Sequence, residues 1–324
     1  MDVSILTPVH NDESFLERSL RATLAQNTDL EFEVIAIDDG SIDASPQILE
    51  RMEKQEPRLK VIAKPAGGEA SALNAGLEQA GAELIAILEA DVEAESDWLS
   101  ILCEAIGEPG AMGAGGMLLT PREDPWIARI AGYEVEYRQS RQSRYVHHIT
   151  SANALYRREA FGRHGAFKDN LINSCLDVDF NQRLIAAGHK LVFEPRAKVR
   201  HHYKGSFWSY LKRQYAYARY RPFLQNLHLY ERDVTISMQL GLSLLTIANL
   251  ALLPLSVWPF LVMLLLTFLS SLPVAVPIYK QKRDNVMLLF PFVMFGRSIA
   301  GLMGLARGYL AKMLQGGSAE DAAV

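Results

Sequence analysis

The sequence predicts an α/β fold in which a mostly parallel sheet carries helices on its faces and is followed by membrane helices. Two observations support this prediction. Short β-rich segments alternate with helical segments through the first ninety or so residues, which is the pattern of repeated β–α units. Later, the stretch from Val234 to Tyr279 contains no Asp, Glu, Lys, Arg or His.

The N-terminal elements follow from hydrophobic spacing and turn residues. Strands are expected where β-rich runs end in polar clusters, and helices where apolar residues recur at helical spacing. The expected strands are VSILTPV (3–9), FEVIAIDDGS (32–41), LKVIAK (59–64) and AELIAILEAD (82–91). The expected helices are ESFLERSLRATLAQN (13–27), SPQILERMEKQ (45–55) and EASALNAGLEQA (69–80).

Further along the chain the pattern is less regular. We expect a strand over 110–119, a strand and short helix over 150–167, a helix over 176–188 and a strand over 189–203 broken at Pro195. Residues 126–148 show no clear period, and the sequence has no internal repeat. The tail 313–324 is small and polar and is expected to be disordered.

Polar clusters follow three of the expected strands: His10-Asn11-Asp12, Asp38-Asp39-Gly40-Ser41 and Glu89-Ala90-Asp91. In an open α/β sheet, ligands bind at the carboxyl ends of the strands. The three clusters therefore predict a site at one edge of the sheet. The alternative for Glu89-Ala90-Asp91 is a polar cap where a strand meets solvent.

The bulk composition excludes several classes of protein. A formal net charge of −4 gives no basic field for nucleic acid. Two cysteines, far apart, give neither a disulfide framework nor a zinc signature. The first residues contain no basic leader or long apolar run, so no signal peptide is expected, and we place the first two-thirds of the chain in the cytosol.

The uncharged stretch 234–279 is long enough for two membrane spans of about 20 residues each. Pro254 and Pro259 near its middle indicate a helical hairpin, with spans at about 236–253 and 257–278. Basic residues on both sides place both ends in the cytoplasm. A third apolar segment, 285–306, contains Arg297 and is either a third span, with Arg297 facing protein, or a re-entrant or interfacial helix. A buried helical pair in a soluble domain is the alternative for the whole region.

The ordered motifs across roughly residues 3–202 resemble those of family 2 glycosyltransferases with the GT-A fold. They are SILTPVHNDESFLERSLRATLAQ, FEVIAIDDGSIDAS, AGGEASALNAGL, AELIAILEAD, SANALYRREAF, DVDFNQRLIAAG and EPRAKVRHH. The membrane hairpin resembles that of bacterial members that build exopolysaccharides or modify lipid-linked sugars. The resemblance implies a catalytic domain over 1–230 and a membrane region over 231–312.

The resemblance also implies roles for individual residues. Nucleotide or substrate contacts are expected from Pro8, His10, Asn11, Asp38, Asp39, Gly68, Asn74 and Asp179. A divalent cation, Mg²⁺ or Mn²⁺, is expected at Glu89, Asp91 and His201, where Glu89 replaces the first aspartate of the family's Asp-x-Asp. Asp177 aligns with the general base, and Leu176 replaces the usual glutamate before it. For Asp177 and Asp179, the structural alternative is stabilisation of a helix N-terminus.

The resulting hypothesis is an inverting, non-processive, metal-dependent transferase in the cytoplasmic membrane, with its catalytic domain in the cytoplasm. Its donor would be a nucleotide-diphosphate sugar, with a UDP-sugar favoured, and its acceptor a lipid-linked sugar or a saccharide. The Gln-x-x-Arg-Trp motif of processive synthases is missing after Gln214, and 205–223 instead reads as an amphipathic helix at a membrane surface. One alternative is a polyprenyl-phosphate glycosyltransferase. Another is a non-catalytic membrane protein that binds nucleotide sugars.

Overall fold

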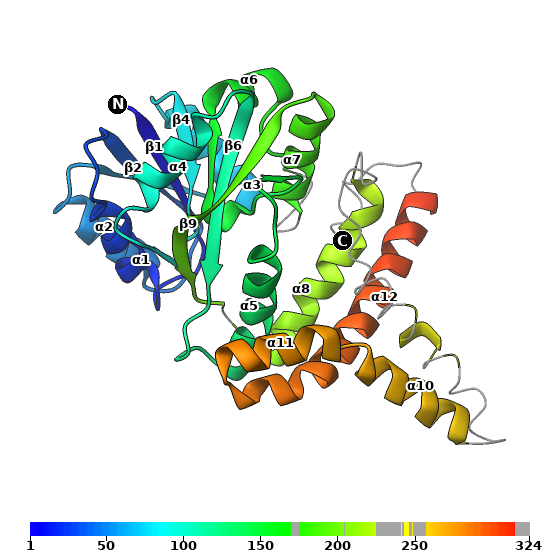
Figure 1. The fold of residues 1–324 in the computed structure, drawn as a ribbon. Helices are drawn as coiled ribbons and strands as arrows, with labels where there is room; N and C mark the ends of the chain where they lie inside the picture. Colours follow the sequence, from blue (N-terminus) through cyan, green and yellow to red (C-terminus); the bar gives the residue numbers. More distant parts are fainter. Residues whose placement is uncertain are drawn as a thin grey trace. The chain divides into compact units, whose positions relative to one another are not determined.

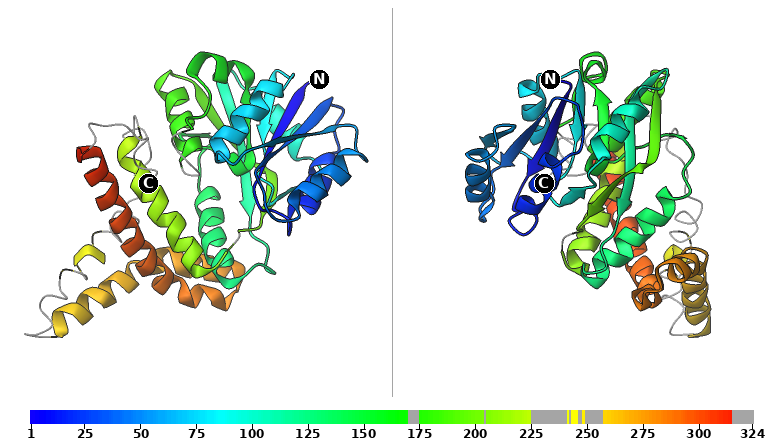
Figure 2. Two further views of the ribbon diagram at one scale, coloured as in Figure 1. Left: turned by 180° about the vertical axis from the view of Figure 1, so that it is seen from behind. Right: turned by 60° about the vertical axis from the view of Figure 1, so that its left-hand side comes forward.

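A mixed sheet with strand order β3-β2-β1-β4-β8-β6-β9-β5 organises the N-terminal part of the protein (Figure 1). The computed structural model describes residues 1–169, 175–203, 205–224 and 257–314, together with 241, 243–245 and 248. Four strands form the parallel half of the sheet: β1 (Val3–Val9), β2 (Phe32–Asp39), β3 (Leu59–Lys64) and β4 (Leu84–Ile87). In Figure 2, β1 and β2 lie side by side in blue.

The other half of the sheet mixes both directions. It contains β5 (Val92–Ala94), β6 (Ala111–Leu119), β8 (Ala154–Arg157) and β9 (Lys190–His201), and β7 (Tyr145–Val146) pairs with β9 at one side. Strand β8 runs antiparallel to both β4 and β6, whereas β6 and β9 are parallel. The α/β class is confirmed, and in the described chain the continuous parallel run is confined to β3-β2-β1-β4.

Helices cover both faces of the sheet, because β1 and β2 are apolar on both of their faces. Val3, Ile5 and Val34 point into one core, and Leu6 and Ile35 point into the other. The first core is covered by α1 (Leu16–Leu24), α2 (Ser45–Glu53) and α4 (Trp98–Ile106). The second is covered by α3 (Glu69–Gln79), α6 (Arg158–His164) and α7 (Leu176–Ala186).

Two regions differ from the sequence prediction. Residues 126–148, for which no period was apparent, contain helix α5 (Trp126–Gln139), whose apolar residues are spread around its circumference. The break expected at Pro195 is wrong, since β9 continues through it. The pairing with β6 jumps from Gly116↔Glu194 to Met117↔Lys198, so Pro195 lies in a bulge where its missing N–H costs no ladder hydrogen bond.

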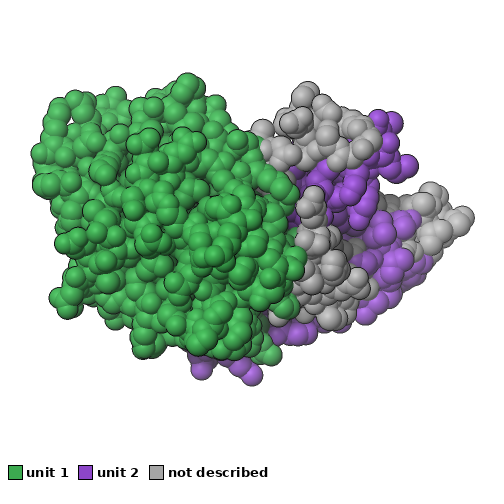
Figure 3. All heavy atoms as spheres, turned by 90° about the horizontal axis from the view of Figure 1, so that it is seen from above, with its two compact units in different colours: residues 1–124, 135–204, 225–230 green, residues 125–134, 205–224, 231–324 purple. Residues whose placement is uncertain are grey.

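The chain divides into two compact units, each made of residues that mainly contact one another (Figure 3). Unit 1 comprises residues 1–124, 135–204 and 225–230, and unit 2 comprises 125–134, 205–224 and 231–324. Helix α8 (Phe207–Tyr220) and the short η2 (Arg221–Phe223) therefore group with the C-terminal helices. The expected boundary at residue 230 stays a prediction.

Unit 2 contains α10 (Trp258–Leu269), α11 (Leu272–Lys282), η5 (Asn285–Leu289) and α12 (Phe290–Leu314). Within the described residues, one helical stretch, 285–314, is long and apolar enough to cross a membrane. The pair α10–α11 also qualifies if it counts as one span, and it is bent by 42° at its break. The second expected span thus corresponds to a broken helix, whereas nearly all of the first, 236–253, lies outside the described residues.

Helix α12 packs closely on α8 and carries Arg297 on its protein-facing side. A Cβ at Gly304 would lie 2.3 Å from the backbone oxygen of Tyr215, so the two helix backbones approach closely. The Arg297 guanidinium donates to Glu134 at 2.7 Å, and both side chains are largely buried. Of the expected tail, residues 313 and 314 belong to α12 and the remainder lies outside the described residues.

Candidate active site

Glu89, Asp91 and His201 come together where β4, β5 and β9 meet. Strand β5 pairs antiparallel with β9 so that Val92 lies opposite His201, and the backbone N–H of His202 donates to the Asp91 carbonyl at 2.9 Å. The Nε2 atom of His201 lies 3.5 Å from Asp91 Oδ1 and 3.8 Å from Glu89 Oε2. One ligand atom from each of the three residues lies within 4.8 Å of the others.

Ser151 fixes the orientation of Glu89. It lies in η1 (Ser151–Asn153), directly before β8, and its hydroxyl donates to Glu89 Oε1 at 2.9 Å. Burial raises the pKa of Glu89, and the Asp91 charge adds to this, whereas His201 opposes it. A cation at this position would favour the ionised carboxylate, which is the form that binds a metal.

Glu69 is a further acid in the same site, and the sequence did not identify it as functional. It is the first residue of α3. Burial raises its pKa well above the usual range, and the carboxylates of Glu89, Asp177 and Asp91 raise it further. Four carboxyl groups from three segments, namely α3, the connection between β4 and β5, and α7, therefore act on one another here. The glycine-rich segment before α3 was the signal that the sequence offered for this part of the site.

Asp177 occupies the first turn of α7. Its Oδ1 accepts from the Val178 N–H at 2.8 Å, and its Oδ2 lies 3.6 Å from His148 Nε2. His148 comes from the segment between β7 and η1 and was not among the residues expected in the site. Asp179 is 2% exposed and forms ion pairs with Lys168 at 2.7 Å and Arg183 at 2.8 Å. Its described contacts are structural ones, and a role in substrate contact stays a prediction.

On the β2 side, Asp39 organises the glycine-rich loop. Its carboxylate accepts from the backbone N–H groups of Gly67 at 2.9 Å and Gly68 at 2.7 Å, and from Lys64 Nζ at 2.6 Å. Gly68 has a φ of 88°, a conformation that favours glycine. Asp38 Oδ1 accepts from the Ser41 N–H at 3.0 Å, so Asp38-Asp39-Gly40-Ser41 forms a turn at the end of β2.

The remaining predicted residues lie in or near these same strand ends, except Asn74. Pro8 is within β1, opposite Ile37 of β2. The ring Nδ1 of His10 lies 2.8 Å from the Asp39 carbonyl, and Asn11, with φ at 57°, accepts from the Ile42 N–H at 2.9 Å. Asn74 instead exchanges hydrogen bonds with the backbone of Phe167, at 2.8 and 3.1 Å, and so ties α3 to the residues that follow α6.

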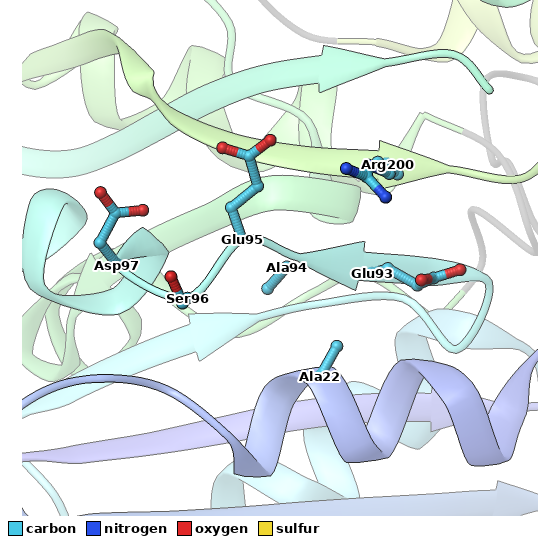
Figure 4. A pocket seen from close by; sticks show the side chains of 7 residues that line it. All are labelled: Ala22, Glu93, Ala94, Glu95, Ser96, Asp97 and Arg200. Atoms are coloured by element: carbon cyan, nitrogen blue, oxygen red, sulfur yellow. The ribbon is translucent and has the colours of Figure 1, made fainter.

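A separate cavity of about 450 Å³ lies beside β5 and contains none of the predicted site residues (Figure 4). Its lining is acidic apart from one arginine and small side chains: Ala22, Glu93, Ala94, Glu95, Ser96, Asp97 and Arg200. The convergence of ligand atoms makes the Glu89–Asp91–His201 cluster the better candidate for chemistry.

Known proteins share sequence or fold with the chain. The family "Glycosyl transferase family 2" matches residues 4–165. The putative glycosyltransferase EpsH of Bacillus subtilis is 35% identical over 106 residues, which is 33% of this chain and 30% of EpsH. Glycosyltransferase AglE of Haloferax volcanii is 25% identical over 196 residues, which is 59% of this chain and 64% of AglE. The undecaprenyl-phosphate 4-deoxy-4-formamido-L-arabinose transferase of Edwardsiella ictaluri is 31% identical over 134 residues, 40% of each chain. The chain thus spans less than two thirds of each of these relatives.

Solved structures share the fold at low sequence identity. The mannosyltransferase PcManGT of Pyrobaculum calidifontis, in complex with GDP-Man and Mn²⁺, superposes with a TM-score of 0.58 at 16% identity, covering 93% of this chain and 86% of that one. S. aureus TarS 1–349 in complex with UDP gives 0.51 at 16% identity, covering 98% and 92%. Since the family match covers half of the chain, the protein belongs to glycosyl transferase family 2.

Proposed function

We propose that the protein transfers a sugar from a nucleotide diphosphate to an acceptor hydroxyl, with inversion of the anomeric centre, at the cytoplasmic face of a membrane. The main support is the convergence of Glu89, Asp91 and His201 at the carboxyl edge of the sheet. Asp177 belongs to the same site, because its charge and that of Glu89 both act on Glu69.

The donor set fits a divalent cation, Mg²⁺ or Mn²⁺. Two carboxylates and one imidazole offer ligand atoms within 4.8 Å of one another, and carboxylate oxygens suit both ions. When bound, such an ion neutralises the charge of the leaving diphosphate. Glu89 is held for this role by Ser151, and Asp91 by the pairing of β5 with β9.

Asp177 would remove the proton from the acceptor hydroxyl. The acceptor oxygen forms a bond to the anomeric carbon, the bond from that carbon to the diphosphate oxygen breaks, and the electron pair leaves with the diphosphate. A positioned general base typically contributes a factor of about 10²–10⁴ in rate. The loop tied together by Asp39, Gly67 and Gly68 would contact the nucleotide, for which we favour a UDP-sugar.

A membrane-borne acceptor is supported by unit 2. Its helices carry large exposed apolar side chains, among them Trp208 at 71% and Trp258 at 70%, which suit a lipid interface. The stretch 285–314 is apolar enough to span a bilayer. We therefore propose a lipid-linked sugar or a saccharide at the membrane surface as the acceptor, added one sugar at a time.

Release of nucleotide diphosphate by purified membranes tests this function. A panel of nucleotide sugars would be offered with Mn²⁺ or Mg²⁺ to the wild type and to Asp91→Ala, Asp177→Asn and Asp97→Asn. Asp97 is an exposed acid outside the site, so its variant controls for loss of a carboxylate. We expect one donor to be consumed, Asp91→Ala to lose turnover, Asp177→Asn to fall about 10²–10⁴-fold and Asp97→Asn to keep full activity. Equal turnover in the wild type and Asp91→Ala would contradict the metal site.

The second candidate is transfer to a polyprenyl phosphate, which the name of the Edwardsiella ictaluri relative favours. A phosphate oxygen is already ionised and needs no general base. With polyprenyl phosphate as acceptor, Asp177→Asn would then keep turnover within about tenfold of the wild type, since a general base contributes at least 10²-fold where one is needed. A loss as large as that expected with a hydroxyl acceptor would exclude this candidate.

A further inference from the structure

A buried hydrogen-bonded chain leads to the imidazole beside Asp177. The Tyr156 hydroxyl donates to Asn181 Oδ1 at 2.9 Å, and Asn181 Nδ2 lies 2.6 Å from the Ile149 carbonyl and 3.1 Å from His148 Nδ1. The other ring nitrogen of His148, Nε2, lies 3.6 Å from Asp177 Oδ2. Asn181 is 0% exposed and Tyr156 is 1% exposed, so water does not compete for these groups.

The contacts of Asn181 fix the orientation of its amide. A backbone carbonyl only accepts hydrogen bonds, so the atom facing the Ile149 oxygen is the nitrogen. The amide oxygen therefore faces the Tyr156 hydroxyl, which donates to it. The second hydrogen of the same nitrogen points to His148 Nδ1.

The orientation of the amide in turn fixes the tautomer of His148. Its Nδ1 faces a donor, so Nδ1 is the unprotonated, accepting nitrogen. The ring proton of the neutral imidazole is then on Nε2, the nitrogen that faces Asp177. A distance of 3.6 Å is longer than a hydrogen bond, but contacts around a catalytic group are often long before substrate binds.

We propose that His148 is the positioning residue for Asp177, holding the carboxylate through its Nε2–H while Asn181 holds the imidazole in the required tautomer. This inference rests on the proposed function, in which Asp177 is the base. One carboxylate oxygen accepts from the Val178 N–H and the other faces His148. The carboxylate plane is thereby fixed, and the proton of the acceptor hydroxyl goes to a remaining lone pair. His148 keeps its own proton throughout, because Nδ1 is occupied by Asn181.

Two substitutions of His148 test whether the hydrogen-bond donor at Nε2, rather than the imidazole ring as such, is required. In His148→Asn the amide oxygen can replace Nδ1 as the acceptor from Asn181, but nothing replaces Nε2–H. In His148→Gln the longer side chain can place an amide N–H where Nε2–H lies. Both variants would be measured as full-length protein in membranes, with the donor identified in the release assay, for kcat, for KM of the donor and for nucleotide binding with Mn²⁺.

We expect His148→Asn to lower kcat about ten- to a hundredfold, with the KM of the donor and nucleotide binding within about twofold of the wild type, as for an interaction made only in the transition state. His148→Gln should recover most of that loss. A normal kcat in His148→Asn would overturn the inference, as would an equal loss in both variants or a change confined to KM.

Asp177→Asn, measured in parallel, distinguishes this inference from the function on which it rests. A severe loss in Asp177→Asn with normal turnover in His148→Asn overturns the role of His148 alone. Normal turnover in Asp177→Asn overturns the base itself. If both roles hold, adding His148→Asn to Asp177→Asn should cost no more than about twofold, because residues that act as one unit are not additive.

Discussion

Glu194 allows a quantitative test of the structure through the pH dependence of stability. This carboxylate lies on β9 with 5% of its side chain exposed, and it accepts from Arg196 Nε at 2.9 Å and from Arg144 Nη1 at 2.6 Å. Arg196 first, and then Arg144, lower its pKa from 4.5 to about 2. The perturbation is Glu194→Gln, which removes the charge and keeps the shape.

The magnitude follows from the pKa difference. A change from 4.5 to about 2 corresponds to about 3.4 kcal/mol, at about 1.36 kcal/mol for each pH unit. The two arginines are 58% and 38% exposed, so solvent screens the pair, and we expect about 1–2 kcal/mol at pH 7. Because the folded pKa is below the unfolded one, this stabilisation is present above pH 4.5 and is lost as the pH falls toward 2.

The assay is urea unfolding of the full-length protein in detergent at pH 7, 5 and 3, followed by tryptophan fluorescence. The matched control is Glu104→Gln. Glu104 Oε2 lies 3.1 Å from Arg196 Nη2, and the Glu104 side chain is 66% exposed. Loss of this exposed ion pair should change the free energy of unfolding by less than about 0.5 kcal/mol. Equal stability of Glu194→Gln and the wild type at pH 7 would refute the reasoning. A difference that stays constant down to pH 3 would also refute it.

Three further perturbations have expected outcomes. Gly116→Ala should lower the free energy of unfolding by more than about 2 kcal/mol, since its Cβ would lie 1.9 Å from the Ala197 carbonyl oxygen. The control Gly162→Ala, whose Cβ would have no atom within 4 Å, should be tolerated in the same urea titration. Arg297→Ala should lower the thermal midpoint in detergent by breaking its buried ion pair, a change typically worth about 3–5 kcal/mol, and a midpoint equal to that of the wild type would contradict this contact. Asn74→Ala should lower kcat with little change in stability, because it removes the two hydrogen bonds to the backbone of Phe167, and an unchanged kcat in the release assay would show that this contact is not needed.

The acidic strand ends could be predicted from the sequence because the physical signal is local. Apolar runs such as LIAI, followed at once by Glu89 and Asp91, indicate both a buried strand and a polar edge. The parallel order β3-β2-β1-β4 then brings the ends of several strands to one edge, and the structure shows this arrangement. His201 joins them through the pairing of β9 with β5.

The rest of the site depends on contacts between distant segments. Nothing around His148 in the sequence indicates that Asn181 will orient its ring, and Glu69 resembles an ordinary first-turn acid until burial beside three other carboxyls is seen. Helix α5 was missed because it is buried on several sides and so lacks a single apolar stripe. Pro195 indicated a break because the bulge that accommodates it is formed jointly with β6.

The position of β9 has a consequence for how the chain folds during synthesis. Of the described strands, β9 is made last, yet it lies inside the sheet, between β6 and β5. Until residue 201 has left the ribosome, β5 has no partner and the edge of β6 stays open to pairing with other chains. Insertion of this single late strand covers the edge of β6, gives β5 its partner and at the same moment completes the Glu89–Asp91–His201 cluster. A nascent chain therefore brings the three residues of this cluster together only when the open edge of β6 is covered.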